Sequence, residues 1–297
     1  MKRLEKTKRD VRKDRLTTIL LVCMLLAGIV ILAYPSVSNW WNEKVTSRAV
    51  ATYDEAVANL SATDYTAYFE AAEAYNAMLA EIGSSRTIPS PELVDEDYWD
   101  LLDVSGTGVM GYVTIEKIDV QLPIYHGTDV NVLQTASGHL EGTSLPVGGE
   151  STHCVISAHR GLPSALLFTH LDQMEIGDTF TITVLDRVMT YEVDQISIVE
   201  PTEIEKLYIE EGKDYCTLLT CTPYGVNSER LLVRGVRVEN ADQKLISVTA
   251  EATKLSPLLA APMLAVPMVL LLLIWVSWDS HRVRSRKNKK DRDRSGQ

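Results

Sequence analysis

The sequence predicts a mostly β domain that closes into a barrel, preceded by a helical extension and flanked by two membrane-spanning helices. Short β-like runs fill residues 111–239, and a segment rich in Ala, Glu and Tyr comes before them. An apolar stretch lies near each end of the 297-residue chain. The hydrophobic content of 45% is enough for one sizeable core.

The first apolar stretch occupies residues 16–34 and follows a basic tail at residues 1–15. A helix of ~20 apolar residues crosses the hydrocarbon core of a bilayer. The Lys and Arg residues of the tail predict a cytoplasmic N-terminus. A cleaved signal peptide, cut near Ser36-Val37-Ser38, is the alternative. Its apolar core is usually only about 7–15 residues long, so a retained anchor is favoured.

The second apolar stretch, residues 255–278, carries no charge and is followed by a basic tail at residues 279–297. Pro257, Pro262 and Pro267 recur within it, and membrane helices tolerate such prolines. A buried core helix is the alternative, but the basic tail favours a stop-transfer segment. Both termini are then expected in the cytoplasm, with the middle of the chain outside the cell.

A helical extension is predicted over residues 43–82, which contain no Gly or Pro. It forms one or two helices, and Ser61 or Thr63 is the expected cap of the second. Residues 83–108 contain prolines and glycines and are read as a linker or a lid, and residues 241–254 as a second linker.

The β-like runs of residues 109–240 are short, rich in β-branched residues and separated by Gly, Pro and Asp. Seven or eight such strands favour a closed or nearly closed barrel. Two short helices are expected at residues 129–134 and 164–173. The expected strands are Gly111–Ile115, Val120–Tyr125, His153–Ala158, Thr179–Leu185, Met189–Glu200 with a break or bend, Tyr215–Thr220 and Leu231–Glu239.

The charge distribution excludes nucleic acid as a partner. Each basic tail holds eight Lys or Arg against three Asp or Glu, a net charge of +5, while the whole chain carries −11. The segment between the tails therefore carries −21 and repels phosphate backbones. The membrane surface accounts for the basic ends instead.

Cys221 is the expected nucleophile among three cysteines outside the membrane segments. It stands where an apolar strand ends and a turn begins, which places a thiol at the rim of a sheet. Cys216 lies five residues earlier, and this odd spacing puts the two thiols on opposite faces of an unbroken strand. Three external cysteines are an odd number, so at least one has no intrachain partner. A packed, inert thiol is the alternative for each.

His159 and Arg230 are the expected partners of this thiol. His159 ends a β run, and a histidine both tunes a thiol and protonates a leaving group. Arg230 follows Cys221 across a short loop, so the two can face each other in a hairpin, and its charge can stabilise an oxyanion. A surface role is the alternative for both. Their rivals are His126, His139, His153, His170, Arg234 and Arg237.

Several segments, in order, resemble class C sortases, the pilin-polymerising members of the sortase family. Thr217-Leu218-Leu219-Thr220-Cys221 resembles the TLxTC signature of that family, and Arg230 lies where its catalytic arginine follows. The resemblance covers roughly residues 100–240 and is specific. Its other segments are Gly108–Tyr112, Leu122–Gly127, Gly138–Pro146, Ser157–Gly161 and Cys221–Asn227.

The resemblance implies an eight-stranded sortase barrel on the outer face of a Gram-positive cell. It implies that an LPxTG-like sorting signal is cleaved between Thr and Gly, with Cys221 forming a thioester. Arg230 would stabilise the oxyanion, His159 would transfer protons, and Thr220 would help to position the substrate. The acceptor would be a pilin Lys amine, and the thioester conserves the bond energy, so no cofactor or metal is implied.

One departure from the class C pattern concerns the lid. Many class C enzymes carry an Asp-Pro-Phe or Asp-Pro-Trp motif that plugs the site. This chain has Asp97 and Trp99 with Tyr98 between them. Either Asp97 and Trp99 form a lid, or Trp99 packs on the barrel as a loop aromatic commonly does.

Three other functions remain alternatives at the level of the sequence. A wall-anchoring sortase would use a peptidoglycan cross-bridge amine as acceptor. A non-catalytic membrane receptor would bind sorting signals without reacting with them. A cysteine hydrolase would use water as its main acceptor.

Overall fold

The structure is a computed structural model that describes residues 2–83 and 96–240. The described residues divide into two units, residues 2–37 and residues 38–83 with 96–240, and each is described by itself. The predicted linker at 241–254, the second span at 255–278 and the tail at 279–297 lie outside the described residues. So do residues 84–95 of the segment read as a linker or lid.

Helix α1 (Lys2–Ala58) contains the first predicted span. From Leu16 onward it is long and apolar enough to cross a membrane, with a mean hydropathy of 2.8 in its most apolar window. The helix continues without a break from the predicted span through Pro35 into the predicted extension. Proline removes one backbone donor, and a helix tolerates this where neighbouring groups readjust.

Helix α2 (Ala62–Gly83) forms the rest of the helical extension, and its start confirms the expected cap. The Ser61 hydroxyl accepts a hydrogen bond from the Asp64 backbone N–H at 3.4 Å, and the Asp64 carboxylate accepts from the Ser61 N–H at 2.8 Å. This reciprocal arrangement is a capping box, which satisfies the first free N–H groups of a helix. Ser61, one of the two residues considered, therefore starts α2.

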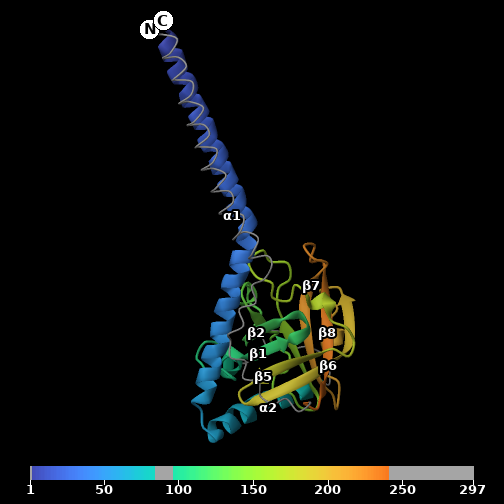
Figure 1. Ribbon diagram of the computed structural model, residues 1–297. Coiled ribbons are helices and arrows are strands. Elements are labelled where there is room, and N and C mark those ends of the chain that lie inside the picture. The colour runs from blue at the N-terminus through green and yellow to red at the C-terminus, as the bar shows by residue number, and fades with distance from the viewer. Residues whose placement is uncertain (1, 84–95, 241–297) are drawn as a thin grey trace. The chain divides into compact units, whose positions relative to one another are not determined.

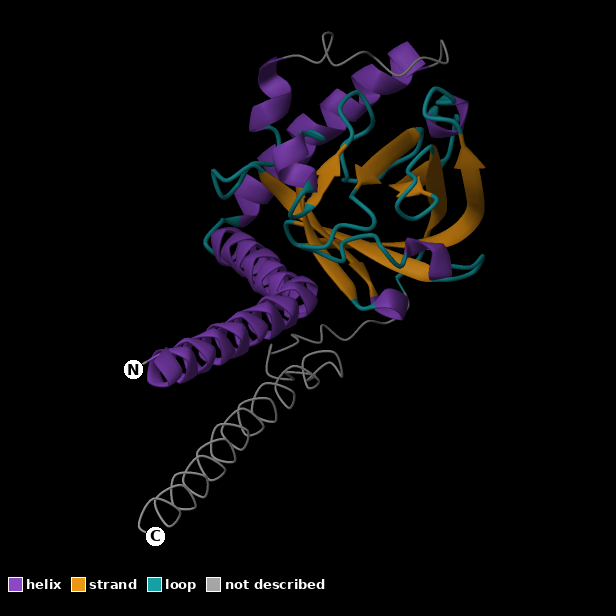
Figure 2. Cartoon of the chain, turned by 90° about the horizontal axis from the view of Figure 1, so that it is seen from above, coloured by secondary structure: helices purple, strands orange, loops and turns teal. Residues whose placement is uncertain are grey.

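The described residues of the second unit contain eight strands that close into a barrel in the order β1-β2-β3-β4-β7-β8-β6-β5 (Figures 1 and 2). The predicted mostly β barrel is confirmed. The strands are β1 (Val109–Ile115), β2 (Val120–Tyr125), β3 (Ser137–His139), β4 (Thr152–Ser157), β5 (Thr179–Val184), β6 (Arg187–Val199), β7 (Asp214–Thr222) and β8 (Glu229–Val238).

The helical turns between strands are short. The expected helix at residues 129–134 is confirmed as α3 (Val130–Leu133), and the break expected in β6 is a register shift between Val193 and Gln195. The other turns are the 3-10 helices η2 (Glu96–Asp100), η3 (Glu116–Ile118), η4 (Leu171–Gln173) and η5 (Glu205–Leu207).

The expected helix at residues 164–173 is wrong apart from η4. Leu167 has a positive φ of 44°, which an α-helix does not accommodate. The Phe168 N–H donates to the His159 carbonyl at 3.1 Å instead of to a residue one helical turn earlier. The segment is therefore a loop folded back on the end of β4.

The barrel has a large core inside and a smaller apolar cluster on its outer face. Alternate residues of β4 and β7, among them Ile156 and Leu218, belong to the main core. The residues between them point the other way, because side chains alternate along a strand. They contribute to a separate cluster formed by Val155, Val199, Leu207 and Leu232, with Leu140 and Leu219 packed against it.

The helices are anchored to the barrel by buried polar contacts. The Tyr53 hydroxyl of α1 donates to the Met110 carbonyl at 2.9 Å and accepts from the Leu185 N–H at 2.8 Å. The Asn76 side chain of α2 bonds both backbone groups of Leu145, at 2.7 and 3.1 Å. In Figure 1, α2 lies below the barrel, at the opposite end from the turn that joins β7 to β8.

Candidate active site

Cys221 and Arg230 are direct partners across the β7–β8 hairpin, as the sequence predicts. Directly opposed residues of an antiparallel pair put their side chains on the same face. Cys221 is half-buried, and Arg230 donates to the carbonyls of Asn227 and Glu229 at 3.3 and 3.0 Å. These bonds hold the guanidinium against the turn beside the thiol.

His159 lies two residues beyond the end of β4, the strand that neighbours β7 on the side away from β8. Strands β4 and β7 are parallel, and their register pairs Ser157 with Leu219. The Ala158 N–H continues this ladder by donating to the Leu219 carbonyl at 3.1 Å. Two residues beyond the last pair, the same register brings His159 level with Cys221. The three predicted residues therefore form one row across β4, β7 and β8.

This row lies on the outer face of the barrel. Cys221 follows Leu219 by two residues and Arg230 precedes Leu232 by two, and both leucines contribute to the outer apolar cluster. The predicted separation of the thiols is also confirmed, because Cys216 is fully buried in the main core. The site thus combines a thiol, an imidazole and a guanidinium next to an apolar surface.

Burial of the His159 ring lowers its pKa below the ordinary value, since an uncharged imidazole is favoured where water is excluded. The group remains partly open to solvent. An uncharged imidazole can accept a proton and pass it on, which suits proton transfer to and from a substrate amine.

Thr220 faces away from this row. Its side chain is buried and its hydroxyl donates to the Ala158 carbonyl at 2.7 Å. Ala158 immediately precedes His159, so Thr220 ties the end of β4 to β7. The geometry therefore favours an indirect effect of Thr220 on the site, through the position of His159.

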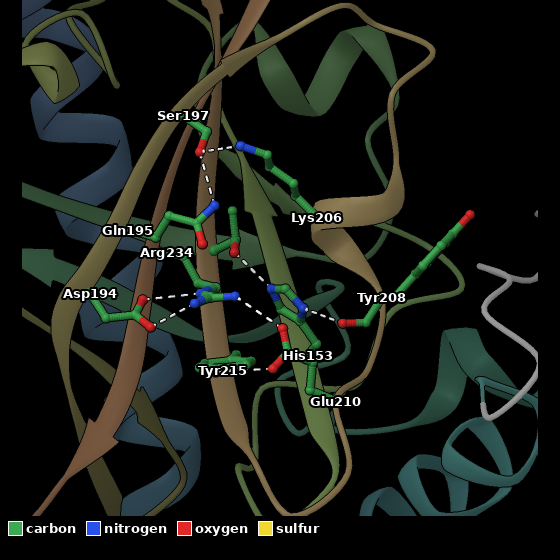
Figure 3. Close-up of polar contacts among 10 residues, drawn as sticks. His153, Asp194, Gln195, Ser197, Lys206, Tyr208, Glu210, Tyr215 and Arg234 are labelled. Atoms are coloured by element: carbon green, nitrogen blue, oxygen red, sulfur yellow. Dashed lines mark hydrogen bonds and ion pairs between the residues drawn. The ribbon is translucent and has the colours of Figure 1, made fainter.

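Three of the four rival histidines are engaged elsewhere. His126 bonds the carbonyls of Gly108 and Leu101, and His139 bonds the Tyr98 hydroxyl at 2.8 Å. The His153 ring lies between the Tyr208 carbonyl at 3.0 Å and the Thr217 hydroxyl at 2.7 Å (Figure 3).

The rival Arg234 binds acidic groups on the same outer face as His153. Its guanidinium makes two bonds to the Asp194 carboxylate, at 3.0 and 2.7 Å, and one to Glu210 at 3.3 Å (Figure 3). It also lies over the Tyr215 ring, 4.0 Å from the centroid. This network joins the β6–β7 connection to the barrel wall and leaves Arg230 as the arginine beside the thiol.

Asp97 and Trp99 lie in η2. The Trp99 ring packs against Tyr98, with centroids 5.1 Å apart, and against His126 at 6.0 Å. Tyr98 is fully buried and accepts a hydrogen bond from the Gly127 N–H at 3.1 Å. These contacts favour the packing role for Trp99, and a lid role stays a prediction.

Comparison with known proteins finds relatives of the barrel domain. The model of the sortase domain matches residues 113–238. The solved structure of sortase C1 from Streptococcus agalactiae is 46% identical, covers 65% of this chain and 100% of that one, and has a TM-score of 0.61. Sortase C of Streptococcus pneumoniae is also 46% identical, with coverages of 64% and 96% and a TM-score of 0.57.

The chain belongs to the sortase family. Sortases are cysteine transpeptidases, and the resemblance of the sequence to class C is confirmed by these two likenesses. Among curated relatives, sortase D of Bacillus subtilis is 29% identical over 43% of this sortase. Sortase A of Streptococcus agalactiae is 30% identical over 42%. This sortase spans 63% and 51% of the lengths of those two relatives.

Sequence reasoning missed a further residue of this sortase that borders the row. Arg160 directly follows His159, and its guanidinium donates to the Thr222 hydroxyl at 3.2 Å. Thr222 directly follows Cys221. The only signal in the sequence is the place of a charged residue immediately after the expected histidine.

Proposed function

We propose that this sortase is a pilin-polymerising transpeptidase that cleaves an LPxTG-like sorting signal between Thr and Gly. The observation that carries the proposal is the single row formed by His159, Cys221 and Arg230 on the outer face of the barrel. A thiol, a proton carrier and a fixed positive charge are the groups that acyl transfer through a thioester requires.

In the proposed first half-reaction, His159 takes the proton of the Cys221 thiol and the sulfur attacks the Thr carbonyl carbon. Arg230 stabilises the negative charge that develops on the carbonyl oxygen. The bond from carbon to the Gly nitrogen breaks, and His159 gives its proton to that amine. The enzyme then holds the substrate as a thioester of Cys221.

In the second half-reaction, a Lys ε-amine of another pilin subunit attacks the thioester. His159 takes a proton from this amine, the thiolate leaves, and an isopeptide bond joins the two subunits. The apolar cluster beside the row supports binding of the apolar part of the signal. Two similar proteins support a pilin amine as the acceptor. One is sortase C1 of a pilus island, and the other is the Streptococcus pneumoniae enzyme, whose structure bears on pilin substrate specificity.

We further propose that the catalytic unit lies outside the cell, with two membrane spans and both termini in the cytoplasm. The apolar part of α1 and the positive tails support this orientation. Single cysteines placed in the two tails, in a variant without native thiols, are expected to resist an impermeant thiol reagent added to intact cells. Labelling of either tail from outside would contradict the arrangement.

The central test is mass spectrometry of the full-length protein mixed with an LPxTG peptide. Acyl mass is expected on Cys221 and is expected to be absent in Cys221→Ala. A protein that binds the peptide but gains no acyl mass would support the receptor alternative and contradict the transpeptidase.

A second test offers the thioester three acceptors in competition. The pilin Lys amine is expected to form product faster than a peptidoglycan cross-bridge peptide, and both faster than water. Preference for the cross-bridge peptide would identify a wall-anchoring sortase. Hydrolysis as the main outcome with plentiful amine would identify a hydrolase.

A further inference from the structure

The loop of residues 159–172, which follows β4, is tied back onto the end of that strand. The Phe168 N–H donates to the His159 carbonyl at 3.1 Å, and the Gly161 N–H to the Thr169 hydroxyl at 3.2 Å. The Leu166 N–H donates to the Asn39 side chain of α1 at 2.8 Å. His159 therefore sits at the base of a loop whose conformation decides where its ring lies.

Arg160 is the charged residue at the centre of this loop. Its side chain is only 9% exposed, and its Nη2 donates to the Asp172 carboxylate at 2.6 Å. Its Nη1 donates to the Thr222 hydroxyl of β7 at 3.2 Å. Burying a guanidinium costs free energy unless the group is paired and hydrogen-bonded. Arg160 is buried outside the hydrophobic core, so we look for the role of this residue in the neighbouring catalytic site.

The contacts of Arg160 join the neighbours of the two reacting residues. Arg160 follows His159, and Thr222 follows Cys221. Gly161, the next residue, passes close to Tyr224 of the β7–β8 turn, since a Cβ added at Gly161 would lie 3.1 Å from that ring. The bond from Arg160 to Thr222 is therefore made where the loop lies close to the end of β7.

Strand pairing holds this region only as far as Ala158. The paired residues of β4 and β7 end at Ser157 and Leu219, and the Ala158 N–H adds one further bond to the Leu219 carbonyl. The register points the His159 backbone toward the level of Cys221, but the position of its ring depends on the loop that follows. The Thr220 hydroxyl, which bonds Ala158, supports one side of the junction, and Arg160 supports the other.

We propose that Arg160 is a positioning residue of the transpeptidation reaction, which holds His159 against Cys221 through its bonds to Asp172 and Thr222. This inference rests on the proposed function and adds a residue to it. Arg160 acts through His159 and need not touch the substrate. Reacting groups misplaced by about 1 Å lose on the order of 100-fold in rate, so a tether of this kind has a large effect on turnover.

The kinetic test uses full-length protein in detergent with an LPxTG peptide and an amine acceptor. Arg160→Met is expected to lower kcat by roughly 10- to 100-fold while KM stays within about threefold, because the tether orients reacting groups and does not bind the signal. Arg160→Lys retains a charge for Asp172 and is expected to recover part of the loss. Arg187→Met, which cuts an ion pair to Glu73 of α2, is the matched control and is expected to keep kcat.

A spectroscopic test follows His159 itself. Its imidazole C–H signals, recorded by NMR against pH, are expected to titrate below the ordinary histidine value in the wild type. In Arg160→Met the loop opens, water reaches the ring, and the midpoint is expected to rise. Asp172→Asn is expected to give a smaller rise with the barrel intact, which covers the case in which Arg160→Met folds poorly.

Wild-type kcat together with an unmoved His159 titration in Arg160→Met would overturn the inference. So would a loss of rate that comes from KM alone. If the wild type forms no thioester, the proposed function fails, and the His159 titration then decides the positioning role by itself.

Discussion

Three thiols of the barrel unit lie in different surroundings, and these decide their reactivity. Cys154 and Cys216 are partners on adjacent strands and are buried in the core. Burial raises the pKa of the Cys216 thiol well above its usual range, and its hydrogen bond with Cys154 raises it further. Cys221 is half-buried on the outer face of the barrel.

Substitution of these thiols one at a time should separate their roles. Cys216→Ala is expected to keep thioester formation while the free energy of unfolding falls by about 1–2 kcal/mol, because a packed sulfur is lost. Cys221→Ala is expected to keep the stability and lose the thioester. Intact-mass spectrometry and thermal unfolding measure the two effects, and an acyl adduct on Cys216 would contradict the assignment.

A second prediction concerns the stability of the fold against pH. Burial lowers the pKa of His153 to about 4. Its Nδ1 donates to the Tyr208 carbonyl, so the neutral ring accepts from Thr217 through Nε2. Between the ordinary value and pH 4, the unfolded chain binds a proton that the folded chain does not. The free energy of unfolding is therefore expected to fall by up to about 3 kcal/mol as pH drops through that window.

Chemical denaturation at a series of pH values measures this slope. His153→Gln is expected to flatten the part of the curve between pH 4 and 6.5 that His153 contributes. Thr217→Val removes the hydroxyl partner but no titrating group, so it should lower stability and keep the slope. A His153→Gln curve parallel to that of the wild type would show that another group is responsible.

At the scale of elements, a substitution of Trp99 tests whether η2 is a lid or part of the barrel wall. The residue is 51% exposed, and its ring packs on Tyr98 and His126. From this packing, Trp99→Ala is expected to leave the alkylation rate of Cys221 within about twofold of wild type and to lower the melting temperature slightly. An alkylation rate that rises many-fold in Trp99→Ala, but not in the matched Asp97→Asn, would instead establish a lid.

Elements with a strong local pattern were predictable from the sequence, and those set by distant contacts were not. The alternating β runs, the capped start of α2 at Ser61 and the apolar span gave clear signals. Strand β3 is only three residues long and offers no alternation to detect. The loop at 164–170 reads as a helix because its bonds to His159 and Asn39 involve residues far from a helical spacing.

The candidate site also contains residues that the sequence identified and residues that it missed. Cys221, His159 and Arg230 stand at strand ends beside turns, so their positions and the sortase-like motifs pointed to them. The tether of Arg160 was missed because its partners, Asp172 and Thr222, lie 12 and 62 residues away in the sequence. The direction of the Thr220 side chain was missed for a related reason, since only the barrel register shows that it meets Ala158.

At the scale of the whole molecule, the helix that contains the apolar span also forms part of the barrel unit. Residues 38–58 of α1 belong to that unit, and Tyr53 is their most buried contact with it. Its hydroxyl bonds β1 at Met110 and the β5–β6 turn at Leu185. Tyr53→Phe leaves two buried backbone groups without their partner, each of which costs about 1–3 kcal/mol.

Tyr53→Phe is therefore expected to lower the melting temperature of the full-length protein in detergent by several degrees. Tyr75 of α2 is a matched control, because its buried hydroxyl has no hydrogen-bond partner among the described residues. Removing that hydroxyl leaves no group unpaired, so Tyr75→Phe should be neutral or slightly stabilising. If both variants melt like the wild type, the hydroxyl of Tyr53 does not anchor α1. The barrel would then owe its stability to its own strands, with α1 attached mainly by apolar contact.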